Sequence, residues 1–347
     1  MSNLIPLRYI YQKYIDRGSF GSVSLYKDSY LDRLVAIKTI LKQEDNSSLS
    51  EVRLIKKIDS KHVVGIYDVI EDENELVIIQ EYLSGSNLNE KLGLCDRHEL
   101  LMFAYQMIAG IEDIHKSGVC HRDIKLENMK FDAENVLKIF DFGISRIGDN
   151  HSTMNGGATI AYAAPELWIQ DEDGKIKLSF AVDIYAFGVA IWALATGKID
   201  TFNPIFPNCI QPSFQSINLN INKQLSNALN ATLHQDHKLR PSASFLKKLL
   251  HKELLKGKHQ ANFVHSQAVH TLNNKVTSTT IKVPTDTARL TVSYNGYDFT
   301  ADNIIGEVLF NNQKITPQQV LPAACVITFS ESNTFISFSS SHPETVI

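Results

Sequence analysis

The first 80 residues alternate short apolar runs with polar or glycine-containing turns. Apolar and β-branched side chains dominate five runs, which are residues 9–15, 22–26, 34–38, 62–70 and 75–80. Residues 16–21 separate the first two runs and contain Gly18 and Gly21, and the polar segment 71–74 separates the last two. Short β-prone runs punctuated in this way predict an antiparallel sheet.

One helical pattern interrupts these strands at residues 48–58. Leu49, Val52 and Ile55 recur at the spacing of one helix face. Glu51 lies beside this apolar stripe, so its carboxylate can point toward the interior. A surface position is the alternative for this glutamate.

From residue 98 onward the apolar spacing becomes helical. Residues 98–117 repeat apolar side chains at i, i+3, i+4 and i+7, and Gly118 follows as a helix stop. Residues 183–197 are apolar nearly all round, which predicts a buried central helix. A basic helix is expected at residues 242–256. A small β-rich part is thus followed by a larger helical part.

The carboxyl-terminal region returns to a β pattern. Residues 257–286 are polar with few periodic apolar positions and are predicted to be a linker. Residues 287–347 then form a β-rich module of about six short strands, which would close a small sandwich or barrel. Three hairpins are expected, at residues 290–300 around Asn295-Gly296, at residues 307–312, and at residues 326–338.

Composition narrows the class of protein. Hydrophobic residues make up 44% and charged residues 21% of the 347, which is typical of a globular chain. The formal net charge of −4 supplies no basic field, so nucleic-acid binding is not expected. No apolar run is long enough to span a bilayer, and the amino terminus does not resemble a signal peptide. Four scattered cysteines fit a reducing compartment, so a cytoplasmic protein without membrane attachment is expected.

Chemistry-bearing side chains concentrate between residues 121 and 143. Asp123, Lys125, Asn128 and Asp141 lie within about twenty residues of one another. Transfer of a phosphoryl group requires positioning and charge neutralisation more than covalent chemistry, and these side chains supply both. Carboxylate and amide oxygens are also the ligands that Mg²⁺ accepts.

The order His121-Arg122-Asp123, Asn128 and Asp141-Phe142-Gly143 resembles the protein kinase family, and Lys125 resembles its serine/threonine branch. The resemblance covers about residues 6–256. It implies an α+β, two-lobed kinase fold over residues 1–256, with a small lobe at about 6–80 and a large lobe at about 84–256. It does not extend to the carboxyl-terminal module.

The resemblance assigns roles to the central residues. Asp123 would accept or orient the proton of the substrate hydroxyl, and Lys125 would neutralise charge on the transferred phosphoryl group. Asn128 and Asp141 would hold Mg²⁺. Lys38, at the end of an apolar strand, would hold the α- and β-phosphates of ATP while pairing with Glu51, for which Glu44 is the rival.

The resemblance also outlines a nucleotide pocket, with the backbone of Glu81 and Leu83 binding adenine and Asn87 as a candidate for the ribose. Two positions depart from the family pattern, because Asp16 stands at the first glycine and Lys130 stands where an apolar adenine floor is usual. The full predicted nucleotide set is Gly18, Gly21, Val23, Ala36, Lys38, Glu81, Leu83, Asn87 and Lys130.

The segment between Asp141 and Ala164-Pro165-Glu166 resembles an activation loop. Arg122 would bind a phosphate there, since guanidinium binds phosphate in a bidentate manner. Ser152 and Thr153 are the candidate phosphosites, and Thr159 resembles a structural threonine that contacts the catalytic aspartate. Two structural assignments accompany these, namely Asp183 bracing the catalytic loop and Arg240 pairing with Glu166.

These observations favour a serine/threonine protein kinase that uses MgATP to phosphorylate protein substrates, including its own activation loop. The alternative is a pseudokinase scaffold that binds partners through the kinase surface and the carboxyl-terminal module. A small-molecule or lipid kinase is disfavoured by the peptide platform that Ala164-Pro165-Glu166 implies. The carboxyl-terminal module could dock a partner or could simply pack against and stabilise the large lobe.

Overall fold

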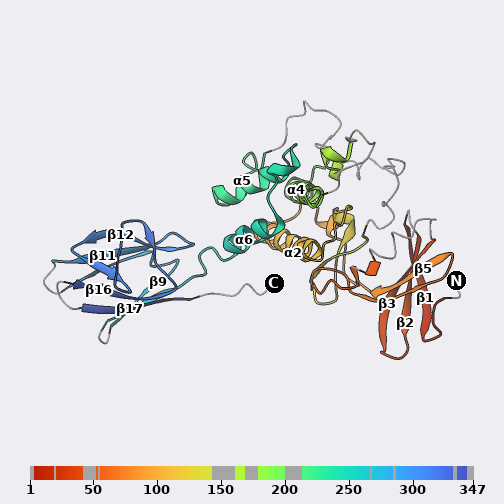
Figure 1. The fold of residues 1–347 in the computed structure, drawn as a ribbon, viewed down its shortest axis with the longest axis horizontal. Coiled ribbons are helices and arrows are strands. Elements are labelled where there is room, and N and C mark those ends of the chain that lie inside the picture. Colours follow the sequence, from red (N-terminus) through yellow and green to blue (C-terminus); the bar gives the residue numbers. More distant parts are fainter. Residues whose placement is uncertain are drawn as a thin grey trace. The chain divides into compact units, whose positions relative to one another are not determined.

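The computed structural model describes residues 4–18, 21–41, 52–53, 55–142, 161–168, 179–199, 213–265, 268–283, 287–330 and 334–341. The chain divides into two compact units, Met1–Leu250 and His251–Val346. Figure 1 shows sheet and helices in the first unit and strands in the second. The predicted α+β kinase fold with an additional β module is confirmed.

The small lobe of the first unit is one antiparallel sheet with strand order β1-β2-β3-β5-β4. Its strands are β1 (Tyr9–Gly18), β2 (Gly21–Asp28), β3 (Arg33–Leu41), β4 (Ile66–Glu71) and β5 (Glu75–Glu81). Successive side chains of a strand point to opposite faces. Val35 and Ile37 of β3 therefore lie on one face, in an apolar cluster, whereas Ala36 and Lys38 lie on the other.

The turn between the first two strands is shorter than predicted. Residues 16–21 were expected as the loop, but Asp16 pairs with Val23 and Gly18 pairs with Gly21 in the β1–β2 ladder. Glycine is required at the start of β2, because a Cβ on Gly21 would lie 2.0 Å from the carbonyl oxygen of Thr39 and its φ is +152°. The close approach of β2 to β3 thus depends on the missing side chain.

The predicted helix at residues 48–58 is described only in part. Val52, Arg53 and Ile55 are helical, and the amide of Lys56 donates to the carbonyl of Val52 at 2.9 Å. Val52 and Ile55 are buried, as the apolar stripe predicts. Glu51 lies outside the described residues.

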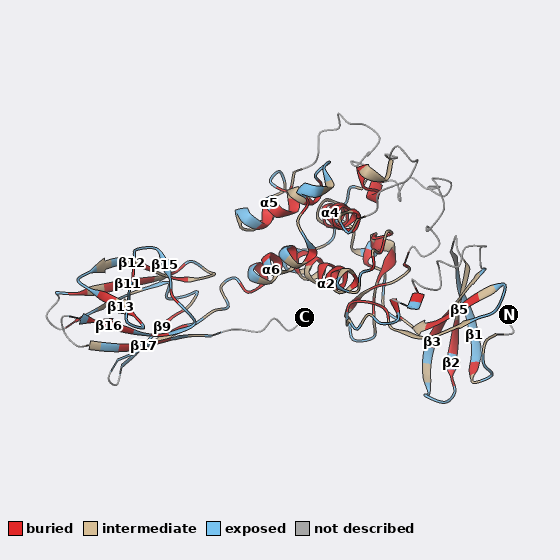
Figure 2. Ribbon diagram, viewed as in Figure 1, coloured by how far each residue is buried: buried red, intermediate tan, exposed pale blue. Residues whose placement is uncertain are grey.

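The large lobe is built mainly from helices, and Figure 2 shows α4 coloured as buried along most of its length. The helices are α2 (Arg97–Lys116), α4 (Ala181–Thr196), α5 (Lys223–Thr232) and α6 (Ala243–Leu254). Asp96 caps α2 by accepting from the amide of Glu99, and Gly118 follows at φ +77°. The helices expected at residues 98–117, 183–197 and 242–256 are confirmed to within two residues.

The short elements of the large lobe carry the site. They are the strands β6 (Met129–Phe131) and β7 (Leu137–Ile139) and the 3-10 helices η1 (Leu88–Lys91), η2 (Leu126–Asn128), η4 (Pro165–Trp168) and η5 (His237–Leu239). The hairpin of β6 and β7 follows the loop that contains Asp123 and leads to Asp141.

The second unit contains two antiparallel sheets around one apolar core, which makes it a sandwich. One sheet has the order β10-β11-β12-β15 and the other β14-β13-β16-β17-β8-β9. The strands predicted from the three hairpins are β11 (Arg289–Tyr294), β12 (Phe299–Ile305), β13 (Val308–Phe310), β14 (Gln313–Lys314), β16 (Ala324–Phe329) and β17 (Thr334–Ser340). All three hairpins pair as expected.

The predicted linker at residues 257–286 is wrong. Three strands occupy most of it, β8 (Ala261–His265), β9 (Ala268–Leu272) and β10 (Ser278–Lys282), and a further short strand, β15 (Gln319–Val320), was also missed. Ala261, Phe263 and Leu272 point into the core and are at most 1% exposed. Each strand offers the core only one or two apolar side chains, so the alternation was too sparse to recognise.

Within the part of the chain that the structure describes, no helix combines the length and the apolar character needed to cross a membrane.

Candidate active site

Asp183, near the start of α4, holds the loop that precedes the central residues. Its carboxylate accepts hydrogen bonds from the amides of His121 at 2.8 Å and Arg122 at 2.9 Å, and lies 2.9 Å from His115 Nε2. Burial would raise the pKa of Asp183, but the hydrogen bond and charge of His115 outweigh it and the pKa is lowered. This bracing was predicted, and it fixes Arg122 at φ +66°.

The central residues are tied to one another directly. Asn128 Nδ2 donates to the carbonyl oxygen of Asp123 and to its Oδ2, both at 2.9 Å. Lys125 Nζ lies 2.9 Å from the same Oδ2. Asp123 and Asn128 are buried, and η2 places Lys125 and Asn128 on either side of one short turn. The structure therefore brings Lys125, predicted as catalytic, and Asn128, predicted as a metal ligand, to the carboxylate of Asp123.

The buried His121 supports this loop as a neutral imidazole. Its Nδ1 accepts from the amide of Asp123 at 3.3 Å, so Nε2 carries the proton and donates to the carbonyl of Phe140 at 3.2 Å. Burial lowers the pKa of His121, which agrees with this tautomer. Its ring also packs on Phe142 with 4.6 Å between centroids.

Asp141 connects this region to the small lobe. Lys38 Nζ of β3 forms an ion pair with Asp141 Oδ1. The amide of Phe140 donates to the carbonyl of Asn128 at 3.0 Å, so the backbone that carries Asp141 runs beside that of Asn128. Asp141 adopts φ +61°, a conformation that an L residue holds only where its surroundings impose it.

The oxygen atoms of Asn128 and Asp141 fit a magnesium ion. Both Asn128 amide hydrogens face Asp123, so its Oδ1 remains as an acceptor, and the Asp141 side chain is 37% exposed. Hard oxygen donors in small number are what Mg²⁺ uses when phosphates and water complete its shell. Within the described residues no cluster of three His, Cys, Asp or Glu side chains forms a separate metal site.

The strands above this region place the predicted nucleotide residues on one sheet face. Val23 of β2 pairs with Lys38 of β3, and Ala36 lies two residues before Lys38 on the same face. Gly18 and Gly21 end and begin the two strands of the hairpin and pair with each other. Val23, Ala36 and Lys38 thus share one sheet face, and Gly18 and Gly21 lie where the hairpin turns at its edge.

The predicted hinge begins at Glu81, the last residue of β5, and contacts from Gly65 and Lys138 hold it in place. The amide of Glu81 donates to the carbonyl of Gly65 at 2.8 Å. Glu81 Oε2 accepts from the Gly65 amide at 3.1 Å and lies 3.0 Å from Lys138 Nζ of β7. Leu83 is buried two residues later. Lys138 was missed by the sequence reasoning, although a lysine between the apolar Leu137 and Ile139 was a signal.

Asn87 and Lys130 are neighbours, as a shared nucleotide pocket requires. They form an isolated antiparallel bridge between the segment before η1 and strand β6. The amide of Asn87 donates to Glu90 Oε1 at 3.1 Å. Lys130 Nζ lies 5.9 Å from the centre of the Tyr82 ring, so the ammonium reaches the predicted hinge.

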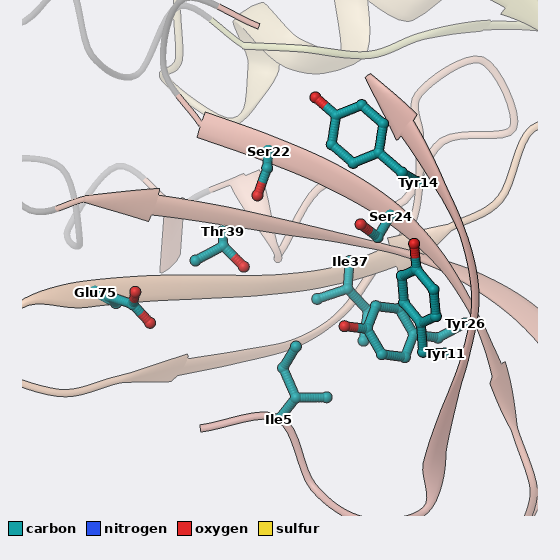
Figure 3. Close-up of a pocket in the computed structure, with 9 residues that line it drawn as sticks. All are labelled: Ile5, Tyr11, Tyr14, Ser22, Ser24, Tyr26, Ile37, Thr39 and Glu75. Carbon is teal, nitrogen blue, oxygen red and sulfur yellow. The ribbon is translucent and has the colours of Figure 1, made fainter. Parts of the chain in front are cut away.

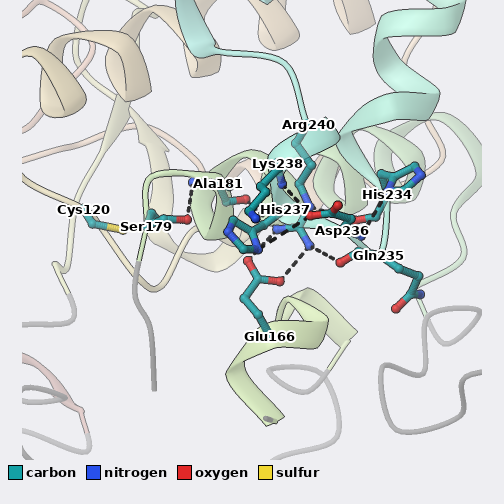
Figure 4. Close-up of polar contacts among 10 residues, drawn as sticks. All are labelled: Cys120, Glu166, Ser179, Ala181, His234, Gln235, Asp236, His237, Lys238 and Arg240. Carbon is teal, nitrogen blue, oxygen red and sulfur yellow. Dashed lines mark hydrogen bonds and ion pairs between the residues drawn. The ribbon is translucent and has the colours of Figure 1, made fainter. Parts of the chain in front are cut away.

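Glu166 and Arg240 form the predicted pair in the large lobe, shown in Figure 4. Arg240 Nη1 and Nη2 donate to Glu166 Oε1 and Oε2, both at 2.7 Å. Arg240 also donates from Nη1 to the carbonyl of Ala181 and from Nε to that of His234, each at 2.9 Å. Because Ala181 begins α4, this guanidinium anchors η4 to the helix that carries Asp183.

Four predicted residues lie outside the described part of the chain: the helical carboxylate Glu51, the candidate phosphosites Ser152 and Thr153, and the structural threonine Thr159. Their roles stay predictions. The rival carboxylate Glu44 also lies outside.

The family of the chain follows from comparison with known proteins. The protein kinase domain model matches residues 9–257, and the chain belongs to this family. The resemblance stated from the sequence is confirmed.

Individual relatives are serine/threonine-protein kinases. The chain is 32% identical over 219 residues to the serine/threonine-protein kinase SRK2I of Arabidopsis thaliana, covering 60% of this chain and 59% of that protein. It is 32% identical over 204 residues to the NUAK family SNF1-like kinase 1 of Mus musculus, covering 55% of this chain and 30% of that protein. The chain thus spans between about a third and three fifths of the length of these relatives.

A solved structure shows the same fold. The chain is similar to the crystal structure of Rad53 1-466 in complex with AMP-PNP, with a TM-score of 0.54 and 20% sequence identity. The match covers 70% of this chain and 64% of that one.

Proposed function

We propose that this chain is a serine/threonine protein kinase that transfers the γ-phosphoryl group of MgATP to hydroxyl groups of proteins. Membership of the protein kinase family supports the reaction, and the names of the relatives support the choice of serine and threonine. The AMP-PNP bound to the similar Rad53 structure supports ATP as the nucleotide.

The observation that carries the proposal is the set of contacts around Asp123. Its Oδ2 faces both Asn128 Nδ2 and Lys125 Nζ at 2.9 Å. A carboxylate held in this way by two donors is pre-oriented, so it can receive a hydroxyl without first reorganising.

The remaining residues would position and neutralise the phosphates. Lys38 of β3 pairs with Val23 of β2 and shares a sheet face with Ala36, from which its ammonium would hold the α- and β-phosphates. Lys125 would shift from Asp123 toward the transferred group as its charge spreads. Asn128 Oδ1 and the Asp141 carboxylate would hold Mg²⁺, whose charge offsets that of the phosphate oxygens when it is bound.

The direct test is transfer of labelled γ-phosphate from MgATP to a generic protein acceptor. Asp123→Asn keeps the shape and the Asn128 contact but removes the charge, and transfer should fall by about 10²- to 10⁴-fold. Lys38→Met should reduce transfer by a similar factor. Its thermal unfolding midpoint should stay close to that of the wild type. Asp113→Asn, at a half-buried position of α2 that pairs with Lys116, is the matched control and should retain activity.

The acceptor residue distinguishes the proposal from its alternatives. Label on serine and threonine that disappears in Asp123→Asn supports a serine/threonine kinase. A folded wild-type protein that binds nucleotide but transfers nothing, even after incubation with cell extract, supports the pseudokinase scaffold. Label on a metabolite or lipid but not on protein supports the third class.

The proposal includes phosphorylation of the chain's own activation loop. Phosphosite mapping after incubation with MgATP should find Ser152 or Thr153 modified in the wild type and unmodified in Asp123→Asn. Modification of the wild type only by another kinase would remove this part while leaving the transfer reaction intact.

A docking role is proposed for the carboxyl-terminal sandwich. Val264, Val269, Val326 and Phe335 are 41–60% exposed and lie on neighbouring strands of the six-stranded sheet. Phe335→Asp should change which proteins of a cell extract the kinase phosphorylates, with activity on a short peptide unchanged. An unchanged protein profile would favour a packing role.

A reducing, cytoplasmic compartment is also proposed. Cys95, Cys120 and Cys325 are free thiols, and burial raises the pKa of Cys95 and Cys325 to about 11. Imaging of the tagged chain in its own cells would test this assignment.

A further inference from the structure

A cavity lies on the sheet face opposite to Lys38. It has a volume of about 360 Å³ and is lined by Ile5, Tyr11, Tyr14, Ser22, Ser24, Tyr26, Ile37, Thr39 and Glu75, shown in Figure 3. Ser22 pairs with Thr39 and Ser24 pairs with Ile37, on either side of the pair Val23 and Lys38. Strand alternation therefore separates this cavity from the nucleotide face.

Three tyrosines form one end of this outer-face cavity. Tyr11 and Tyr26 are cross-strand partners whose rings stand edge to face at 81°, with 5.5 Å between centroids. Regular alternation would send Tyr11 and Tyr14 to opposite faces, but the β1–β2 register shifts between Tyr11 and Lys13. This irregularity directs both rings into the cavity, as β-bulges do elsewhere.

The walls of the cavity present polar groups that the protein does not use. Within the described part of the chain, the six hydroxyls of Tyr11, Tyr14, Ser22, Ser24, Tyr26 and Thr39 make no hydrogen bond to another protein group. The carboxylate of Glu75 likewise forms no ion pair there. Ligand pockets carry a small number of such polar groups, which fix the orientation of the ligand.

The floor is apolar and rigid. Ile37 is 1% exposed and belongs to the cluster that includes Val35, Val77 and Ile79. Ile5, from the segment that precedes β1, packs against the same cluster and forms part of the rim. A mostly rigid site of a few hundred cubic ångströms with few convergent polar groups has the size of a small-molecule pocket.

The charge of the lining and the distance between the two ends of the cavity indicate the chemistry and the shape of a ligand. Glu75 is the only charged side chain of the lining and attracts a cation, whereas the tyrosine rings at the other end offer an aromatic surface. Figure 3 shows Glu75 at the end away from the tyrosines. The two ends stand on β1 and β5, three strand spacings or about 14 Å apart. The ligand must therefore be elongated, with its cation at one end.

We propose that the outer-face cavity binds a small organic amine with an elongated apolar or aromatic body. The ammonium group would pair with Glu75, the body would lie over Ile37, and an aromatic end would pack among the three tyrosines. This binding does not depend on phosphoryl transfer, because it uses the other face of the sheet.

The test is isothermal titration calorimetry of the full chain with 6-phenylhexylamine as the probe. The neutral 6-phenylhexan-1-ol is the comparison ligand and should bind about tenfold more weakly. Glu75→Gln and Tyr14→Ala should each raise the dissociation constant of the amine by about tenfold. The matched controls Glu73→Gln and Tyr30→Ala, both on exposed positions outside the cavity, should leave it within about twofold.

Several results would overturn the proposal. Equal affinity for amine and alcohol, or binding that Glu75→Gln leaves unchanged, would place the probe elsewhere. Tighter binding of the peptide acetyl-Ala-Pro-Arg-Pro-Ala-amide than of the amine, lost in Glu75→Gln, would replace the small-molecule assignment with a peptide site. If Tyr14→Ala fails to fold, Glu75→Gln decides alone, because Glu75 begins β5 and its backbone amide, not its carboxylate, bonds to Asp72.

Discussion

Arg240 and Glu166 stand 74 residues apart in the chain and meet in a two-pronged ion pair, with both nitrogen–oxygen distances at 2.7 Å. The Arg240 side chain is fully buried and that of Glu166 is 13% exposed. Loss of either partner would leave a charge in a place that water reaches poorly.

Arg240→Met should therefore reduce the free energy of unfolding by about 3–5 kcal/mol. Arg240→Lys should recover only part of this, because an ammonium cannot donate to both carboxylate oxygens in the same geometry. Urea unfolding of the full chain measures both. Arg53→Met is the control, since Arg53 is 68% exposed and 3.9 Å from Glu71, and it should cost less than about 1 kcal/mol. A similar cost for both methionine variants would contradict the expectation.

The buried His62 should make stability depend on pH. Burial lowers the pKa of His62 from 6.5 to about 4, and its Nδ1 donates to the carbonyl of Leu137 at 3.0 Å. The folded state therefore holds the neutral imidazole. The contribution of neutral His62 to the free energy of unfolding is complete above pH 6.5, the unfolded-state pKa. It is lost as the pH falls toward 4, and the free energy of unfolding is already about 2 kcal/mol lower at pH 5.

His62→Gln removes the titration and keeps an N–H donor. The difference in unfolding free energy between pH 7 and pH 5 should shrink by about 2 kcal/mol in this variant. Urea titrations at the two pH values measure it. His98→Gln, at an exposed position on α2, should retain the wild-type difference. An unchanged difference in His62→Gln would show that folding does not lower the pKa of His62.

Gly21→Ala should disturb the nucleotide side of the small lobe. The new Cβ would overlap the Thr39 carbonyl, so β2 must move away from β3 next to Lys38. Gly118→Ala is the matched control, because Gly118 also has positive φ but its Cβ would meet nothing within 4 Å. The control should cost about 1–2 kcal/mol from backbone strain alone. Gly21→Ala should destabilise the fold by more than this, which thermal unfolding measures. It should also raise the KM for ATP, which steady-state kinetics measures.

Lys138→Met should weaken nucleotide binding without affecting the transfer step. The ammonium braces Glu81 at the predicted hinge and is only 12% exposed. We expect the KM for ATP to rise about fivefold, roughly 1 kcal/mol, with kcat nearly unchanged. Lys116→Met, on the exposed side of α2, should change neither constant. A fall in kcat at constant KM would show that Lys138 acts on the central loop instead.

The fold of the first unit could be predicted because its elements carry strong local signals. The α2 helix has a capping aspartate at Asp96, a long apolar stripe and a closing glycine at Gly118, and all three act within a few residues. β8 to β10 had no such signal. β8 joins its sheet by pairing with β17, whose partner residues lie 73 to 79 positions further along the chain. No local pattern reports a pairing at that distance.

The same distinction applies to the site. Asp123, Asn128 and Asp141 could be named because family motifs fix their order. The contact of Lys138 with Glu81 could not, because it joins β7 to β5 and depends on how those strands meet. The bulge in β1 was equally invisible, since a register shift leaves no mark in composition. Sequence patterns thus predicted residues that act in fixed order and missed those brought together by strand pairing.

The alternation of β3 has a consequence for insertions and deletions. Ile37 faces the outer cavity, and its neighbours Ala36 and Lys38 face the nucleotide side. Loss or gain of one residue before Ala36 would exchange the two faces of the strand. The Lys38 ammonium would then lie in the apolar cluster, and the Ile37 side chain would face the nucleotide side. The length of this strand should therefore be intolerant of single-codon changes, even where its individual side chains can be replaced.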